Sequence, residues 1–109
     1  MYISIIGIKV RGFFGILKFM RYSMPSFTAA KKANGNFFCE AKKINGYHHT
    51  LTAWENKSKM IDYLKGKHHA LAMKNFRYIG TGFVHGYEDK IIPNWDDAIK
   101  KWKENFKEI

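Results

Sequence analysis

The chain has 109 residues, of which 46% are hydrophobic and 17% aromatic, and this composition excludes a disordered polypeptide. At this length it predicts one domain over residues 1–109. The net charge of +10 is compatible with an anionic partner. However, residues 1–55 carry eight basic and two acidic side chains, residues 56–109 carry eleven and seven, and no block of five like charges occurs. The pattern indicates a solvated basic surface more than a binding stripe.

The apolar N-terminal stretch does not read as a targeting segment. Met1–Ile8 is apolar, but Lys9 and Arg11 follow it rather than precede it. A signal peptide needs positive charge before its apolar stretch, and a membrane span needs about twenty apolar residues. We therefore expect a cytoplasmic protein without a membrane span.

The first third of the chain predicts one strand and two short helices. Tyr2–Val10 alternates and is rich in Ile, which predicts a strand. Phe13–Met20 predicts a short apolar helix. Because proline interrupts a helix that approaches it from the N-terminal side, Pro25 predicts a break and a second helix over Ser26–Ala33.

A β-hairpin is the strongest local signal in the sequence. Asn36–Ile44 and Tyr47–Trp54 both have strand character, and Asn45-Gly46 lies between them. Asn-Gly favours a type I′ turn, since both central positions of that turn need positive φ. The sequence therefore predicts two antiparallel strands here. Cys39 in the first of them rules out an intrachain disulfide, being the one cysteine, and is best explained as a small core residue.

Two helical segments are predicted after the hairpin. Asn56 or Ser58 can cap a helix over Lys57–Leu64, and Gly66 ends it. A further helical stretch is predicted over His69–Phe76.

The last part of the chain predicts a strand and a C-terminal helix. The strand covers Tyr78–Glu88 and carries glycines at alternate positions, which permits the close approach of another surface. Asn94 can cap a helix over Trp95–Lys107, and its apolar residues fall at helical spacing.

The predicted element order is β-α-β-β-α-β with an extra C-terminal helix. This order predicts an α+β, ferredoxin-like fold with an antiparallel sheet and helices on one of its faces. The other face of such a sheet must also be covered.

A resemblance to a known family rests mainly on the middle of the chain. It is carried by Thr50–Glu55 (Thr-Leu-Thr-Ala-Trp-Glu), by the Met60–Leu64 helix, and by Gly66 followed closely by His69 and Met73. The helix–Pro–helix connection and the Asn-Gly helix stop at residues 34–35 also contribute. The sequence resembles the dimeric α/β-barrel superfamily, in particular its spheroidene monooxygenase-like and antibiotic biosynthesis monooxygenase-like branch.

The resemblance implies a homodimer in which two sheets pack through their open faces. It also implies a pocket between sheet and helices for a small apolar or aromatic ligand or for haem, and an oxygenase-type activity that many relatives perform without a cofactor. Relatives usually carry one His at the position of His69, followed four residues later by Met or another apolar residue. His68 leaves a one-residue ambiguity, and residues 70–72 replace the arginines that many relatives carry there.

His69 is the candidate catalytic residue. It can serve as an axial haem ligand or as a general acid/base, and the structural alternative is a histidine that bonds a nearby carbonyl after Gly66. The candidate ligand-binding residues are Trp54, His49, Phe83, His85 and Met73. If His85 shares a sheet face with a histidine of the Tyr47–Trp54 strand, the two could line one cavity.

The sequence also bears on three other classes of function: a metal site, nucleic-acid binding and a non-enzymatic dimer. The five histidines show no metal-ligand spacing, so no metal site built by the protein is expected. RNA-recognition modules share the β-α-β-β-α-β order, but Gly82-Phe83-Val84 lies in the fourth strand instead of the third, which argues against nucleic acid. A ligand-binding or regulatory dimer without enzymatic activity is the main alternative to a monooxygenase-like protein.

Overall fold

The computed structural model describes residues 1–76 and 80–109. It contains four helices and five strands among these residues. In chain order they are β1 (Tyr2–Val10), α1 (Gly12–Lys32), β2 (Asn36–Ile44), β3 (Tyr47–Trp54), α2 (Lys57–Leu64), α3 (Lys67–Phe76), β4 (Gly80–Glu88), α4 (Trp95–Asn105) and β5 (Lys107–Glu108). The predicted α+β, ferredoxin-like fold is confirmed. The first two residues of the strand predicted over Tyr78–Glu88 lie outside the described residues.

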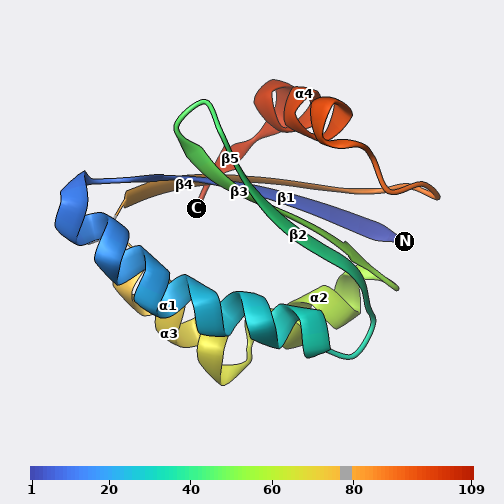
Figure 1. Ribbon diagram of the computed structural model, residues 1–109. Coiled ribbons are helices and arrows are strands. Elements are labelled where there is room, and N and C mark those ends of the chain that lie inside the picture. Colours follow the sequence, from blue (N-terminus) through green and yellow to red (C-terminus); the bar gives the residue numbers. More distant parts are fainter. Residues whose placement is uncertain (77–79) are drawn as a thin grey trace.

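All strands belong to one antiparallel sheet with the order β2-β3-β1-β4-β5. In Figure 1 the helices α1, α2 and α3 lie on one side of this sheet and α4 lies on the other. Side chains alternate between the two faces along each strand. The register pairs Ile5 of β1 with Leu51 of β3 and with His85 of β4, which puts these three residues on the α4 side.

The hairpin prediction is confirmed in detail. β2 and β3 pair antiparallel, with Ile44 opposite Tyr47 at the turn. Asn45 has φ 51° and Gly46 has φ 83°, so both central residues are left-handed as a type I′ turn requires.

The predicted break at Pro25 is wrong, because α1 runs without interruption from Gly12 to Lys32 with this proline inside it. An internal proline removes one helical hydrogen bond and costs about 3 kcal/mol in an isolated helix. Gly15 is buried in the half of α1 that precedes the proline, and Ser26 and Ala30 are buried in the half that follows it. Packing of both halves against the rest of the domain therefore outweighs the local preference of the proline.

The two predicted helices after the hairpin are both present. Asn56 caps α2, its side-chain oxygen accepting a hydrogen bond from the Lys59 backbone N–H at 3.0 Å. Helix α3 begins at Lys67, two residues earlier than the sequence predicts. On the same side of the sheet, Gly86 of β4 leaves room for Tyr2, because a Cβ at Gly86 would collide with the Tyr2 hydroxyl.

Helix α4 covers the sheet face opposite α1–α3. Its Ala98 and Trp102 pack with Ile3, Ile5, Leu51 and Ala53 in the main buried cluster. Asn94 caps it as predicted, accepting from the Asp97 N–H at 2.8 Å. The helix ends at Asn105, and residues 107–108 form the short strand β5, which the sequence did not predict. The face that was expected to be open is thus occupied at its centre by the chain's own C-terminal helix.

Candidate functional site

Three aromatic side chains meet between the sheet and the helices α2 and α3. Trp54 ends β3 and is 1% exposed. Its ring stacks on Tyr63 of α2 with centroids 5.3 Å apart, and the Tyr63 ring meets the His69 ring of α3 edge-on, also at 5.3 Å. We call Trp54, Tyr63 and His69 the inner aromatic cluster. Two of the predicted site residues, Trp54 and His69, are therefore brought together, with Tyr63 between them.

Ser26 of α1 anchors the inner aromatic cluster. The Tyr63 hydroxyl donates to the Ser26 carbonyl oxygen at 2.8 Å, and the Ser26 Oγ lies 2.7 Å from the same hydroxyl. Since the single Tyr63 hydroxyl proton is used on the carbonyl, the Ser26 hydroxyl donates to the Tyr63 oxygen. Burial raises the pKa of Tyr63, so this phenol stays protonated at neutral pH.

The indole N–H of Trp54 is the polar group of this cluster that lacks a partner. The Nε1 atom is buried and makes no hydrogen bond within the described part of the chain. A buried donor without a partner costs roughly 1–3 kcal/mol, and such groups are uncommon in folded proteins. Because the indole nitrogen can only donate, an acceptor oxygen of a bound molecule would satisfy it.

His69 is held as a neutral base. Burial lowers its pKa below the ordinary value, and a hydrogen bond with the Leu64 backbone opposes part of this shift. A neutral imidazole can accept a proton from a phenol or from an acidic C–H group. The backbone bond also matches the structural alternative considered for this residue, so His69 is both anchored and chemically competent.

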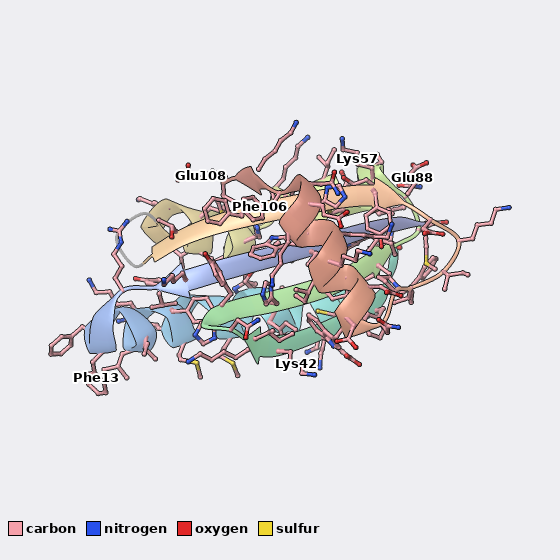
Figure 2. The ribbon with its side chains drawn as sticks, turned by 90° about the horizontal axis from the view of Figure 1, so that it is seen from above. Phe13, Lys42, Lys57, Glu88, Phe106 and Glu108 are labelled. Carbon is pink, nitrogen blue, oxygen red and sulfur yellow. The ribbon has the colours of Figure 1, made fainter. Side chains whose placement is uncertain are left out.

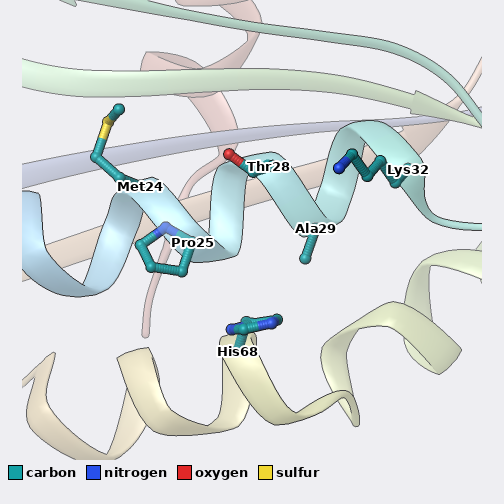
Figure 3. A pocket seen from close by; sticks show the side chains of 6 residues that line it. All are labelled: Met24, Pro25, Thr28, Ala29, Lys32 and His68. Atoms are coloured by element: carbon teal, nitrogen blue, oxygen red, sulfur yellow. The ribbon is translucent and has the colours of Figure 1, made fainter.

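The two adjacent histidines, His68 and His69, occupy different surroundings. His68 is exposed and points toward Pro25 and Ala29 of α1, as Figure 3 shows. It lines a surface groove of about 450 Å³ between α1 and α3, together with Met24, Pro25, Thr28, Ala29 and Lys32. His69 is instead half-buried against Tyr63. Met73 follows on α3 and is exposed at its side chain.

The other three candidate ligand-binding residues lie on the opposite face of the sheet, beneath α4. His49 is 2% exposed; its Nδ1 lies 3.1 Å from the Ile6 carbonyl oxygen and its ring is 4.6 Å from the Trp102 ring. Phe83 contacts Phe106, with ring centroids 4.6 Å apart. His85 stacks on its neighbour Tyr87 at 5.4 Å.

The predicted site residues thus form two groups that the sheet separates. His49 and His85 do share a face, because they pair with Gly7 and Ile5 of β1. However, α4 packs over that face, and the Trp102 Nε1 donates to the Phe83 carbonyl at 2.9 Å. Trp54 and His69 cannot line the same cavity as these residues. Tyr63 is the member of the site that sequence reasoning missed; its position six residues before His69 becomes informative only when the break at Gly66 folds α2 and α3 together.

Because His49 is buried, we expect the free energy of unfolding to decrease in acid. Burial lowers the pKa of His49 below its unfolded value, and Lys103 and His48 lower it further, while the Ile6 hydrogen bond opposes them. Because the pKa of His49 is lower in the folded state, the unfolded chain binds a proton on this residue more tightly than the folded chain does. The contribution of His49 to stability is therefore fully present above the unfolded pKa of about 6.5 and is lost as the pH falls below that value. The free energy of unfolding should therefore be lower at pH 5 than at pH 7.5 in urea titrations.

The variant His49→Asn should make this pH dependence shallower, by up to about 1.4 kcal/mol per pH unit. The matched control is His68→Asn, since the side chain of His68 is exposed. A slope that is the same in both variants would contradict a buried neutral His49.

Cys39 is not a nucleophile at neutral pH. Burial raises the pKa of its thiol to about 11, against a smaller opposing effect of Lys31. The thiolate, which is the reactive form, is therefore scarce. Among the described residues no group of three or more His, Cys, Asp or Glu side chains could hold a metal ion.

The surroundings of His69 fit haem poorly. Haem ligation needs a free imidazole nitrogen that faces a hollow wide enough for the macrocycle. The Tyr63 ring instead packs against the His69 ring, with the two rings at 63° to one another. The second groove, of about 440 Å³, lies between α4 and the preceding connection, and neither it nor the groove between α1 and α3 is lined by His69. His69 in this position is therefore unsuited to be an axial haem ligand.

Comparisons by sequence give no match, either to a protein-family model or to a curated protein. Comparison with solved structures does give matches. A putative antibiotic biosynthesis monooxygenase from Nitrosomonas europaea superposes with a TM-score of 0.74 at 10% identity, over 84% of this chain and 100% of that one. A putative antibiotic biosynthesis monooxygenase from Deinococcus radiodurans gives 0.73 at 14% identity, over 86% and 97% of the two chains.

A third similar structure is SnoaB, a cofactor-independent oxygenase from Streptomyces nogalater, with a TM-score of 0.67 at 9% identity, over 85% of this chain and 97% of that one. The protein therefore has the fold of antibiotic biosynthesis monooxygenase-like proteins, as the resemblance implied. At these identities the similarity concerns the fold.

Proposed function

We propose that this chain is a monooxygenase-like protein that binds a planar apolar or aromatic molecule against the inner aromatic cluster, between the sheet and the helices. The observation that carries the proposal is the buried indole N–H of Trp54 without a partner, beside the stacked Tyr63 ring. Neither of the two grooves is lined by Trp54 or Tyr63, so a planar ring that carries an oxygen would have to part α2 and α3 from the sheet in order to pack against the aromatic rings and accept this hydrogen bond.

In this proposal His69 acts as the general base. Its lowered pKa leaves it neutral at pH 7, and a phenolic or enolic proton of the ligand is the group it would accept. The likeness to SnoaB, described as a cofactor-independent oxygenase, supports chemistry in which the substrate itself reacts with dioxygen once it is deprotonated. We therefore propose an electron-rich phenol as the substrate class and no haem.

The proposal is tested with 1,5-dihydroxynaphthalene as the probe, by isothermal titration and by oxygen uptake. Trp54→Phe keeps an aromatic ring but removes the N–H, and should weaken binding about ten-fold. His69→Gln should abolish oxygen uptake with a smaller effect on binding. The matched control is Trp95→Phe, which removes an exposed indole hydrogen bond to Glu40 on the other side of the sheet.

Each outcome of this test has a separate meaning. Unchanged affinity in Trp54→Phe would place the ligand elsewhere and contradict the proposal. Binding without oxygen uptake would favour a ligand-binding or regulatory protein over an enzyme. A Soret shift with added haemin that disappears in His69→Gln would restore the haem interpretation.

The homodimer through the sheet face stays a prediction. Helix α4 lies over the centre of that face, so a second copy could pack there only beside α4 or after α4 moved or exchanged between copies (Figure 1). Trp102 of this helix and Phe106, the residue that follows it, contact Phe83 on the face where an RNA-recognition module presents its aromatic residues. This packing covers the aromatic face that such a module needs for binding nucleic acid.

A further inference from the structure

The outward side of α1 carries an apolar stripe. Its residues recur at intervals of four and three along the helix, which places them on one side, opposite the buried Gly15 and Ser26. They are Phe13, Leu17, Met20 and Met24, and we call them the α1 stripe. Phe13 is 69% exposed and its neighbour Phe14 is 77% exposed. In Figure 2, Phe13 projects from the end of the molecule, away from the sheet.

All the charged side chains of α1 and of the residues just before it are positive. Residues 9–32 carry six basic and no acidic side chains, and Lys18 and Arg21 lie within the stripe's own turns. Residues 88–109, which include α4, carry five basic and six acidic side chains. The sequence indicated a solvated basic surface more than a binding stripe, but the fold places α1 and α4 on opposite sides of the sheet (Figure 1). The positive charge is therefore concentrated on the side of α1.

We infer that the α1 stripe docks on an anionic lipid surface. Exposed Phe, Leu and Met flanked by Lys and Arg are the combination that binds the interface of an anionic bilayer, with apolar side chains among the acyl chains and cations at the headgroups. Large exposed apolar patches mark interaction sites in general. The basic side chains of α1 complement anionic headgroups, which favours an anionic lipid surface as the partner of this patch.

A second copy of the chain fits this surface less well than a lipid does. Two α1 helices packed through their stripes would bring together two segments with four basic and no acidic side chains each. Like charges at such an interface repel, whereas anionic headgroups neutralise them. In the described part of the chain no helix is long and apolar enough to cross a membrane.

The groove between α1 and α3 continues the α1 stripe. Met24 belongs to both, and Lys32 and His68 line the groove farther along (Figure 3). Its cationic Lys32 lies on the same helix as the apolar residues, which extends the positively charged apolar surface along most of α1. The inference rests on these surface residues and is independent of the proposed function.

The test is flotation of the full chain with 100 nm vesicles, either of phosphatidylcholine alone or with phosphatidylglycerol added. We expect binding to the anionic vesicles that weakens as salt is added. The double variant Phe13→Ser/Phe14→Ser should bind them about ten-fold more weakly or worse, since two large apolar side chains no longer insert. Its matched control is Ile91→Ser, which removes an apolar side chain that is 72% exposed near α4 and should bind within two-fold of the parent.

A charge variant supplies the second arm. Lys18→Gln/Arg21→Gln should lower the affinity for anionic vesicles about twenty-fold, and Lys100→Gln/Lys103→Gln on α4 should change it much less. Absence of binding to anionic vesicles would overturn the inference. Binding that survives the Phe variant but not the charge variant would show electrostatic adsorption alone and would also overturn it. A sizing run that gives two chains for the parent and one for the Phe variant, without vesicle binding, would make the stripe a dimer interface instead.

Discussion

Trp102→Ala should lower the free energy of unfolding by about 3–5 kcal/mol, the range for removing a large buried aromatic side chain. Trp102 is buried in the cluster that joins α4 to the sheet, and its ring contacts Tyr47, His49, Phe83 and Phe106. The substitution also removes the hydrogen bond from its Nε1 to the Phe83 carbonyl. Urea titrations followed by circular dichroism measure the change.

The control for this prediction is Lys103→Ala, the next residue on the exposed side of α4, which should change stability by less than about 0.5 kcal/mol. A loss below 1 kcal/mol in Trp102→Ala would mean that α4 is not docked on the sheet in solution. The sheet face would then be free for another partner.

Gly7→Ala should destabilise the protein by about 2–3 kcal/mol, because the site has no room for a methyl group. A Cβ at Gly7 would collide with Trp102 Cζ2 and would lie 2.7 Å from His49 Cε1. Gly7 is in the middle of β1, so neither the strand nor the docked helix can shift easily. Urea titration gives the effect, and Trp102→Phe in the same background should reduce it, since the shorter ring vacates part of the space.

Gly46→Ala is the matched control for Gly7→Ala. Gly46 has φ 83° and nothing within 4 Å of an added Cβ, so its cost is conformational, about 1 kcal/mol. Equal losses at the two positions would show that the contact between β1, β3 and α4 is looser than described.

Local signals predicted most of the fold. The alternation in β1, the Asn45-Gly46 turn and the Asn94 cap are each encoded within a few residues, and all three are present. The break predicted at Pro25 was wrong because the local tendency of proline to interrupt a helix is opposed by contacts of α1 with distant elements. The position of α4 could not be predicted either, since an amphipathic helix does not specify which face it will cover.

The candidate site was predicted only in part, for the same reason. Trp54 and His69 were each identifiable from their sequence context, but the ring that joins them, Tyr63, belongs to a different element from either. His49 and His85 share a sheet face as alternation implied, yet a helix from the end of the chain buries that face. The charge asymmetry between α1 and α4 likewise depends on which side of the sheet each helix occupies.

The short connection at residues 89–94 keeps α4 close to the sheet face on which it docks. A helix tethered this closely to its docking face faces the sheet at an effective concentration in the millimolar range, so a free partner at micromolar concentration competes poorly even with equal intrinsic affinity. The same tether permits exchange: if two chains meet while their α4 helices are undocked, each helix can dock on the other chain with the contacts of Trp102 unchanged. High protein concentration or brief partial unfolding would then trap an intertwined pair that separates slowly on dilution.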